Sequence, residues 1–188
     1  MFTADSLKAL LIEHDDGVLK TGKHDPGRDF CAMEFLAKVA GEPWTDNPKC
    51  VHEALSAYCR RLNDSRWPSD EARTETMLPL LAAVFGTAEL NISVKNIAEQ
   101  TIRLIASIAM EATAKLNPKH AHALRAAGER CKNEGTREAA LSARTTARRA
   151  DADAYAAAGA TAGADARIET YKVSIGIVMR EIERARAE

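Results

Sequence analysis

The sequence predicts an all-α fold, a helical bundle with a long alanine-rich C-terminal helix or helix pair. Apolar residues recur every three or four positions in nearly every patterned segment, which is the spacing of one helix face. No segment shows the strict alternation and β-branched enrichment that are typical of strands. Half of the residues from Ala139 to Ala166 are alanine, which has the highest helix propensity.

Capping signals place the first two helices. Thr3 and Asp5 are candidate caps for an opening helix. A polar loop over 14–29 follows, and Asp29 is a candidate cap for a second helix predicted over 30–40. The apolar face of the opening helix consists of Leu7, Leu10 and Leu11.

Residues 41–48, Gly-Glu-Pro-Trp-Thr-Asp-Asn-Pro, form a loop that we call the hinge. Its last two residues, Asn47 and Pro48, are a helix-start signal, because proline at the first helical position loses no hydrogen bond. They predict a third helix over 48–63. Its apolar stripe is Val51, Leu55, Tyr58 and Leu62.

Three further helices follow in the middle of the chain. Ser69 is a cap for a helix that Gly86 ends and that Pro79 should kink. The longest apolar stripe then predicts a central, buried helix over 94–116. The cap-then-proline signal at Asn117 predicts a helix over 120–133.

The alanine-rich tract predicts close helix packing. Small side chains every three or four positions let two helix axes approach closely. We expect one long helix over 136–188, or two joined near Gly159–Gly163; disorder is the rival interpretation, which the apolar stripe over 168–182 disfavours. The seam consists of Ala143, Ala147, Ala150, Ala154 and Ala157. We divide the chain into a helical domain over 1–135, which holds the hinge, and a segment over 136–188 that packs on it or on another subunit.

Composition argues against several partners. A net charge of −1 and a pI near 6.5 give no long-range attraction to nucleic acid, and Arg60, Arg61 and Arg66 form too small a basic cluster to change this. No stretch of about 20 uncharged apolar residues is present, so no membrane partner is expected. The N-terminus lacks the pattern of a signal peptide, and four cysteines in such a chain are most simply reduced thiols in a cytoplasm.

The cysteines and histidines do not form a metal-ligand pattern. On a helix over 48–62, Cys50 points away from both His52 and Cys59, while His52 and Cys59 lie about 10 Å apart along the axis. They cannot share one ion with ligands at about 2.0–2.3 Å. We therefore expect no metal and no cofactor.

The hinge concentrates the residues that could carry chemistry. Cys50 is predicted in the first turn of a helix, where a thiolate is favoured, although an inert cysteine packed beside Ala54 is commoner. Glu34 lies among apolar residues, and its sequence context allows three interpretations. It could act as a general base or bind a ligand, it could clamp loop N–H groups, or it could be an exposed ion-pair partner of Lys38. Trp44 and Asp46 in the hinge are consistent with two interpretations. They could line a ligand pocket, or they could make the hinge rigid.

The hinge also carries a resemblance. In order, the chain shows Cys-Ala-Met-Glu, Val-Ala-Gly-Glu-Pro-Trp-Thr-Asp-Asn-Pro-Lys-Cys, Arg-Leu-Asn-Asp and Leu-Pro-Leu-Leu before Gly86. This resembles an uncharacterised family of helical bacterial proteins, frequent in actinobacteria and in phage-related settings, over about 28–87. The resemblance adds Asn63 and Asp64 to the ligand-binding or structural hinge residues. It implies a bacterial or phage cytoplasm and carries over no catalytic residue.

We therefore expect a non-enzymatic helical interaction protein that binds another protein or a second copy of itself. A phage setting would make it an immunity-like or counter-defence factor. The alternative is a small-ligand-binding protein, or a small hydrolase or transferase, that uses a hinge pocket around Glu34, Trp44, Asp46 and Cys50. Neither a phosphate-binding loop nor a nucleophile motif is present in the sequence.

Overall fold

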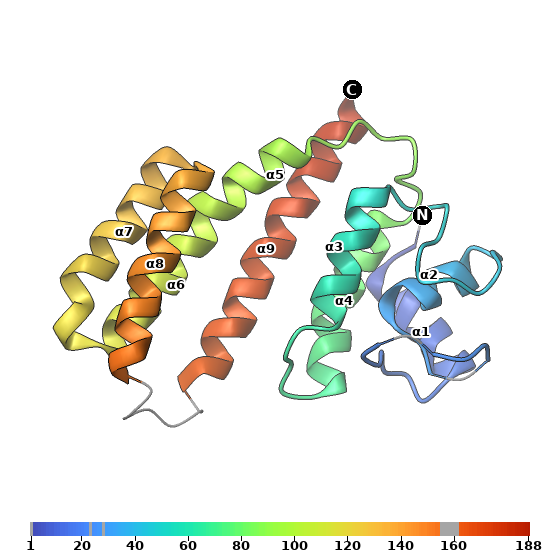
Figure 1. Ribbon diagram of the computed structural model, residues 1–188. Helices are drawn as coiled ribbons and strands as arrows, with labels where there is room; N and C mark the ends of the chain where they lie inside the picture. Colours follow the sequence, from blue (N-terminus) through green and yellow to red (C-terminus); the bar gives the residue numbers. More distant parts are fainter. Residues whose placement is uncertain (1, 23, 28, 155–161) are drawn as a thin grey trace. The chain divides into compact units, whose positions relative to one another are not determined.

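The computed structural model describes residues 2–22, 24–27, 29–154 and 162–188, and every regular element in these ranges is a helix (Figure 1). The all-α prediction is confirmed. The chain divides into two compact units: Met1–Ile92 with Met179–Glu188, and Ser93–Val178. The predicted boundary at residue 135 falls inside the second unit. No helix in the described ranges is long and apolar enough to cross a membrane.

The first unit has a core of large aliphatic and aromatic side chains. Its helices are α1 (Ala4–His14), α2 (Ala32–Val39), α3 (Glu53–Asn63), α4 (Asp70–Val84) and the end of α9 (Ala162–Ala187). Leu7, Phe35 and Met77 are fully buried, one from each of three helices. The opening caps behave as predicted: Thr3 and Ser6 form a reciprocal capping box, and the hydroxyl of Ser69 accepts from Ala72 N.

Two helices of this unit begin later than predicted. The N-cap of α2 is Cys31, whose Sγ accepts from Glu34 N, while Asp29 has a φ of +48° and lies outside the helix. The N-cap of α3 is His52, whose Nδ1 accepts from Ala54 N at 3.2 Å, so the predicted start at Pro48 is wrong. Cys50 therefore lies in a turn before the helix, and the helical angles that argued against a metal among these residues do not apply.

The second unit contains most of the short helices. They are α5 (Val94–Thr101), a π-helical turn (Ile102–Ala106), α6 (Ser107–Leu116), a 3₁₀ turn (Pro118–His120), α7 (Ala121–Glu134), α8 (Arg137–Ala154) and the rest of α9. The predicted helix over 94–116 is found as one continuous run of α5, the π-helical turn and α6. Its apolar stripe is half-exposed rather than buried, and Val94 and Leu116 are each 54% exposed.

Arg103 holds the end of α7. Its guanidinium donates to the carbonyl oxygens of Lys132, Asn133 and Glu134, at 3.0, 2.5 and 3.0 Å. These carbonyls lie in the last turn of the helix, where no intrahelical donor remains. Gly135 has a φ of +64°, and a Cβ there would lie 2.6 Å from Arg103 Nε, so both the backbone and the guanidinium require glycine.

The alanine seam packs within the second unit. Ala139, Ala143 and Ala150 of α8 are buried in one cluster with Met110 of α6 and Leu124 of α7, and Ala147 is partly buried against it. The alanine-rich tract is helical in α8 and in α9, and residues 155–161 between them lie outside the described residues. The side chain of Ala154, and Ala157 and Gly159 as a whole, lie outside the described residues.

Candidate functional site

Glu34 is a fully buried carboxylate that ties the loop before α2 to that helix. Its oxygens accept from His24 N, His24 Nδ1 and Cys31 N, each at 2.9 Å. Burial raises the pKa of Glu34, but the hydrogen bonds from His24 and Cys31 outweigh it and leave the pKa below its ordinary value. Among the three interpretations of Glu34, the contacts favour the clamp.

Trp44, in the hinge, contacts the same loop before α2 that Glu34 holds. Its indole Nε1 donates to His24 O at 3.0 Å, and its ring lies over Phe30 with centroids 5.1 Å apart and planes at 37°. Phe30 in turn packs edge-on against Phe35. The ring of Trp44 thus ties the hinge to Phe30 and to the loop before α2, and the side chain is only partly buried.

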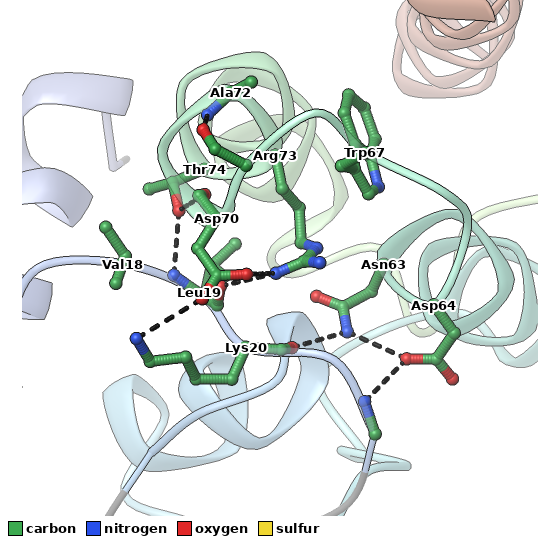
Figure 2. Close-up of polar contacts among 12 residues, drawn as sticks. Val18, Leu19, Lys20, Asn63, Asp64, Trp67, Asp70, Ala72, Arg73 and Thr74 are labelled. Atoms are coloured by element: carbon green, nitrogen blue, oxygen red, sulfur yellow. Dashed lines mark hydrogen bonds and ion pairs between the residues drawn. The ribbon is translucent and has the colours of Figure 1, made fainter. Parts of the chain in front are cut away.

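Asn63 and Asp64, at the end of α3, hold residues 18–22, which have no regular secondary structure and which we call the strap (Figure 2). Asn63 is buried; its Nδ2 donates to Lys20 O at 2.8 Å, and its Oδ1 accepts from Ala32 N at 3.2 Å. Asp64 Oδ1 accepts from Gly22 N at 2.9 Å. Both side chains therefore satisfy backbone groups of the strap and of α2.

Arg73 and Thr74 of α4 hold the strap from the other helix, and sequence reasoning missed both. Thr74 Oγ1 accepts from Leu19 N at 2.8 Å, and Arg73 Nη1 donates to Leu19 O at 2.8 Å (Figure 2). Arg73 also pairs with Asp70 at 2.5 Å, and its buried Nε has no hydrogen-bond partner. Arg73 and Thr74 are neighbours in the polar first half of α4, which also contains Glu75 and Thr76, so residue type gave no signal that would single them out.

Arg60 fastens the hinge to α3. Its Nη1 donates to Asp46 O at 2.8 Å and to Asn47 Oδ1 and Ser56 Oγ, each at 3.0 Å. Arg60 belongs to the small basic cluster seen in the sequence, and here its guanidinium is committed to these three acceptors. Asp46 contributes its carbonyl to this contact.

Cys50 does not have the environment of a nucleophile. Burial, together with a hydrogen bond to Glu42 and the charge of that carboxylate, raises the pKa of the Cys50 thiol to about 11. Glu42 also accepts from the backbone N–H groups of Lys49 and Cys50, at 2.6 and 2.8 Å. Of the two interpretations of Cys50, these contacts favour the inert cysteine over the helix-stabilised thiolate, because the helix starts later and the nearest charge is negative.

Two hollows touch the hinge. A cavity of about 80 Å³ lies among six residues, and a small-molecule site is larger, at roughly 300–1,000 Å³. The residues that line it are Gly22, Cys31, Asp46, Arg60, Asn63 and Asp64. An open hollow of about 530 Å³ lies beside Trp44 and Phe30, with His14, Lys38 and Glu42 at its edges. Within the described ranges no cluster of three or more His, Cys, Asp or Glu could hold a metal ion.

Another hollow is a groove in the second unit, far from the predicted site residues in sequence. It measures about 840 Å³ and runs between α6 and α7, with Glu169 of α9 at its edge. Ile108, Ala112 and Leu116 supply its apolar wall, four residues apart on α6. Gly128 lets α7 approach α6, since a Cβ there would lie 3.1 Å from Met110 Cβ.

One ion pair spans the groove. Arg125 Nε and Nη2 on α7 lie 2.9 and 3.3 Å from the two carboxylate oxygens of Glu111 on α6. The remaining charged residues of the lining, Lys115, Glu129, Lys132 and Glu169, include both signs. The groove is therefore an apolar strip bordered by mixed charges.

Comparison with protein-family models, curated proteins and solved structures finds no match to this chain. The resemblance at the hinge stays a prediction.

Proposed function

We propose that this protein is a non-enzymatic interaction protein that receives an amphipathic helix of a protein partner in the α6–α7 groove. The observation that carries the proposal is the half-exposed apolar stripe of α6, which forms one wall of the groove. An amphipathic helix presents apolar residues at the same three-to-four-residue spacing and fits such a strip. Charges of both signs on the rim would set the orientation of the partner.

The contacts at the hinge support a structural role for the predicted site residues. The polar atoms of Glu34, Asn63 and Asp64 are engaged with backbone groups, and Cys50 holds its proton. A hydrolase or transferase would need a base or nucleophile that is available to a substrate.

Photo-crosslinking in the native cell tests the proposal. A photoreactive amino acid is placed at Leu116 in the groove or, as a matched control, at Leu141 on α8, which is exposed to a similar degree at 50% against 54%. We expect one discrete protein adduct from position 116 that position 141 does not give. The adduct should disappear when Ile108→Glu is added, because a charge would then stand in the apolar wall.

Light scattering of the purified chain separates a partner from a second copy. A dimer mass that Leu116→Glu reduces to a monomer, with Leu141→Glu as the control, would identify the partner as the chain itself. Equal adducts from positions 116 and 141, together with an unchanged mass, would contradict the proposal.

Small-ligand binding at the open hollow beside Trp44 is the second candidate. The aromatic pair of Trp44 and Phe30 favours it, because rings of this kind line small-molecule sites. A planar ligand should shift the indole N–H resonance of Trp44 in a nitrogen–proton spectrum and leave that of Trp67 unchanged. A screen of nucleotides and aromatic acids that shifts neither indole would count against this function.

A further inference from the structure

The two units of the chain carry formal charges of opposite sign, which nearly cancel in the net charge. Ser93–Val178 contains 13 Lys and Arg against nine Asp and Glu, a formal charge of +4, while the rest of the chain carries −5. The value of −1, which argued against nucleic acid, is the result of two unlike units. A partner that meets only the second unit meets a basic surface.

Helix α8 gathers this positive charge on one face. From Arg137 to Arg149 it has four arginines and one acidic residue, Glu138, and Asp151 and Asp153 follow in the last turn of the helix. At 100° per residue, Arg137, Arg144 and Arg148 fall within about 40° of one another. All three are exposed, while the buried alanines of the seam lie on the opposite side of the helix. We call these three residues the arginine face.

These arginines differ from those of the neighbouring helix. On α7, Arg125 pairs with Glu111 and Arg130 with Glu134 at 2.8 Å. Within the part of the chain that the structure describes, Arg137 and Arg144 form no ion pair. The arginine face spans about 16 Å along α8, at 1.5 Å per residue.

We infer that the arginine face of α8 binds the phosphate backbone of nucleic acid, without reading its sequence. Guanidinium groups form bidentate hydrogen bonds to phosphate oxygens. Duplex DNA carries one negative phosphate charge per about 1.7 Å of its axis. The observations favour nucleic acid over an anionic membrane. The apolar side of α8 is packed in its own unit, which leaves Leu141 as the large apolar side chain beside the arginines, too little to insert into lipid. This surface is separate from the α6–α7 groove, so the inference does not depend on the proposed function.

Fluorescence anisotropy with a labelled 20-base-pair DNA and the full-length chain tests this inference, across sodium chloride concentrations from 20 to 200 mM. Three phosphate contacts predict that log affinity falls against log salt with a slope of about −3, so that binding weakens about 40-fold between 50 and 200 mM. Arg144→Gln with Arg148→Gln should reduce the slope to about −1. The same readout on a duplex of unrelated sequence should give the same slope.

A second double variant separates local contacts from net charge. Lys38→Gln with Arg61→Gln removes two exposed positive charges from the first unit and should leave the slope near −3. Both variants must retain the helical spectrum of the parent chain. Equal slopes for the two double variants, or the absence of saturable binding at 20 mM salt, would overturn the inference. So would tighter binding to phosphatidylserine vesicles than to the duplex at the same salt.

Discussion

The two units of this protein are held together in different ways. In the first, seven buried polar or charged side chains accompany a core of large apolar residues; in the second, Ser174 is the buried polar side chain among the described residues. Glu34, Asn63 and Arg73 bind loops that have no regular structure of their own. The second unit instead relies on alanines that bring helices together.

This difference explains where each unit can change. A buried polar group fixes one geometry, because any displacement leaves donors without acceptors. A small-residue contact is non-directional, and its strength depends on how closely the helices approach. The hinge is therefore expected to be rigid, while the second unit presents the half-exposed apolar and arginine faces on which both proposals rest.

The largest effect is expected from Glu34→Ala. Loss of the carboxylate leaves the buried N–H of Cys31 and the partly buried N–H of His24 without acceptors, at roughly 1–3 kcal/mol for each. We expect the free energy of unfolding, measured in urea, to fall by about 4 kcal/mol. Glu13→Ala on the exposed side of α1 is the control and should change it by less than about 0.5 kcal/mol. A loss below about 1 kcal/mol at Glu34 would show that the first unit does not depend on this clamp.

The same residue gives the first unit a defined acid dependence. The pKa of Glu34 in the folded chain lies below its ordinary value of 4.5, so the unfolded chain takes up the proton more readily. The stabilisation is therefore present above that value and is lost as the pH falls through the folded-state pKa. Glu34→Gln should remove this part of the stability change between pH 5 and the acid limit, as followed by urea unfolding at each pH. An unchanged acid profile would contradict the lowered pKa.

Trp44→Ala should cost the next largest amount. Truncation of a buried large aromatic costs about 3–5 kcal/mol, and because Trp44 is only partly buried we expect the lower end, about 3 kcal/mol. Trp44→Phe keeps the ring over Phe30 and loses the hydrogen bond to His24 O, at about 1 kcal/mol. A melting temperature within a degree of the parent for both variants would show that the ring does not stabilise the hinge.

Local sequence patterns predicted the helices of both units. They did not predict the hydrogen bonds that join the loops of the first unit to its helices. Thr3 and Ser69 were found because hydroxyl caps are common, whereas Cys31 and His52 were missed because sulfur and imidazole rarely cap helices. The bond from Arg73 to Leu19 joins residues 54 apart, and no local pattern contains it.

The helical spacing of apolar residues also did not predict how far their side chains are buried. The stripe over 94–116 has the spacing of a buried face and is half-exposed, because the spacing is the same whether a second helix covers it or not. The site residues Glu34, Trp44, Asn63 and Asp64 could be singled out by type. Their roles depend on loop backbone groups whose positions follow from the tertiary fold.

Overpacking of the seam tests the second unit. Ala143 is buried against the α6–α7 cluster, so Ala143→Leu should lower stability by about 2 kcal/mol by forcing the helices apart. Ser142→Leu, on the neighbouring exposed position, is the control and should leave stability nearly unchanged. Hydrogen exchange should quicken in α7 and α8 and stay unchanged in α3. Faster exchange in α3 as well would show that the two units do not unfold independently.

The smallest and most local effect is expected at Cys50, where the measured quantity is the reactivity of the thiol. With the pKa of its thiol at about 11, only about one molecule in a thousand carries the thiolate at pH 8. Alkylation by iodoacetamide, followed by intact mass, should therefore be slow and rise about tenfold per pH unit up to pH 10. Glu42→Gln removes the neighbouring negative charge and should speed the reaction several-fold at pH 8, because the pKa of Cys50 then falls.

Cys50→Ser identifies the reacting residue. Cys31, Cys59 and Cys131 are buried, so this variant should take up no label under native conditions. A rate that levels off below pH 9 would mean that Cys50 has a stabilised thiolate. The hinge would then again be a candidate site for chemistry.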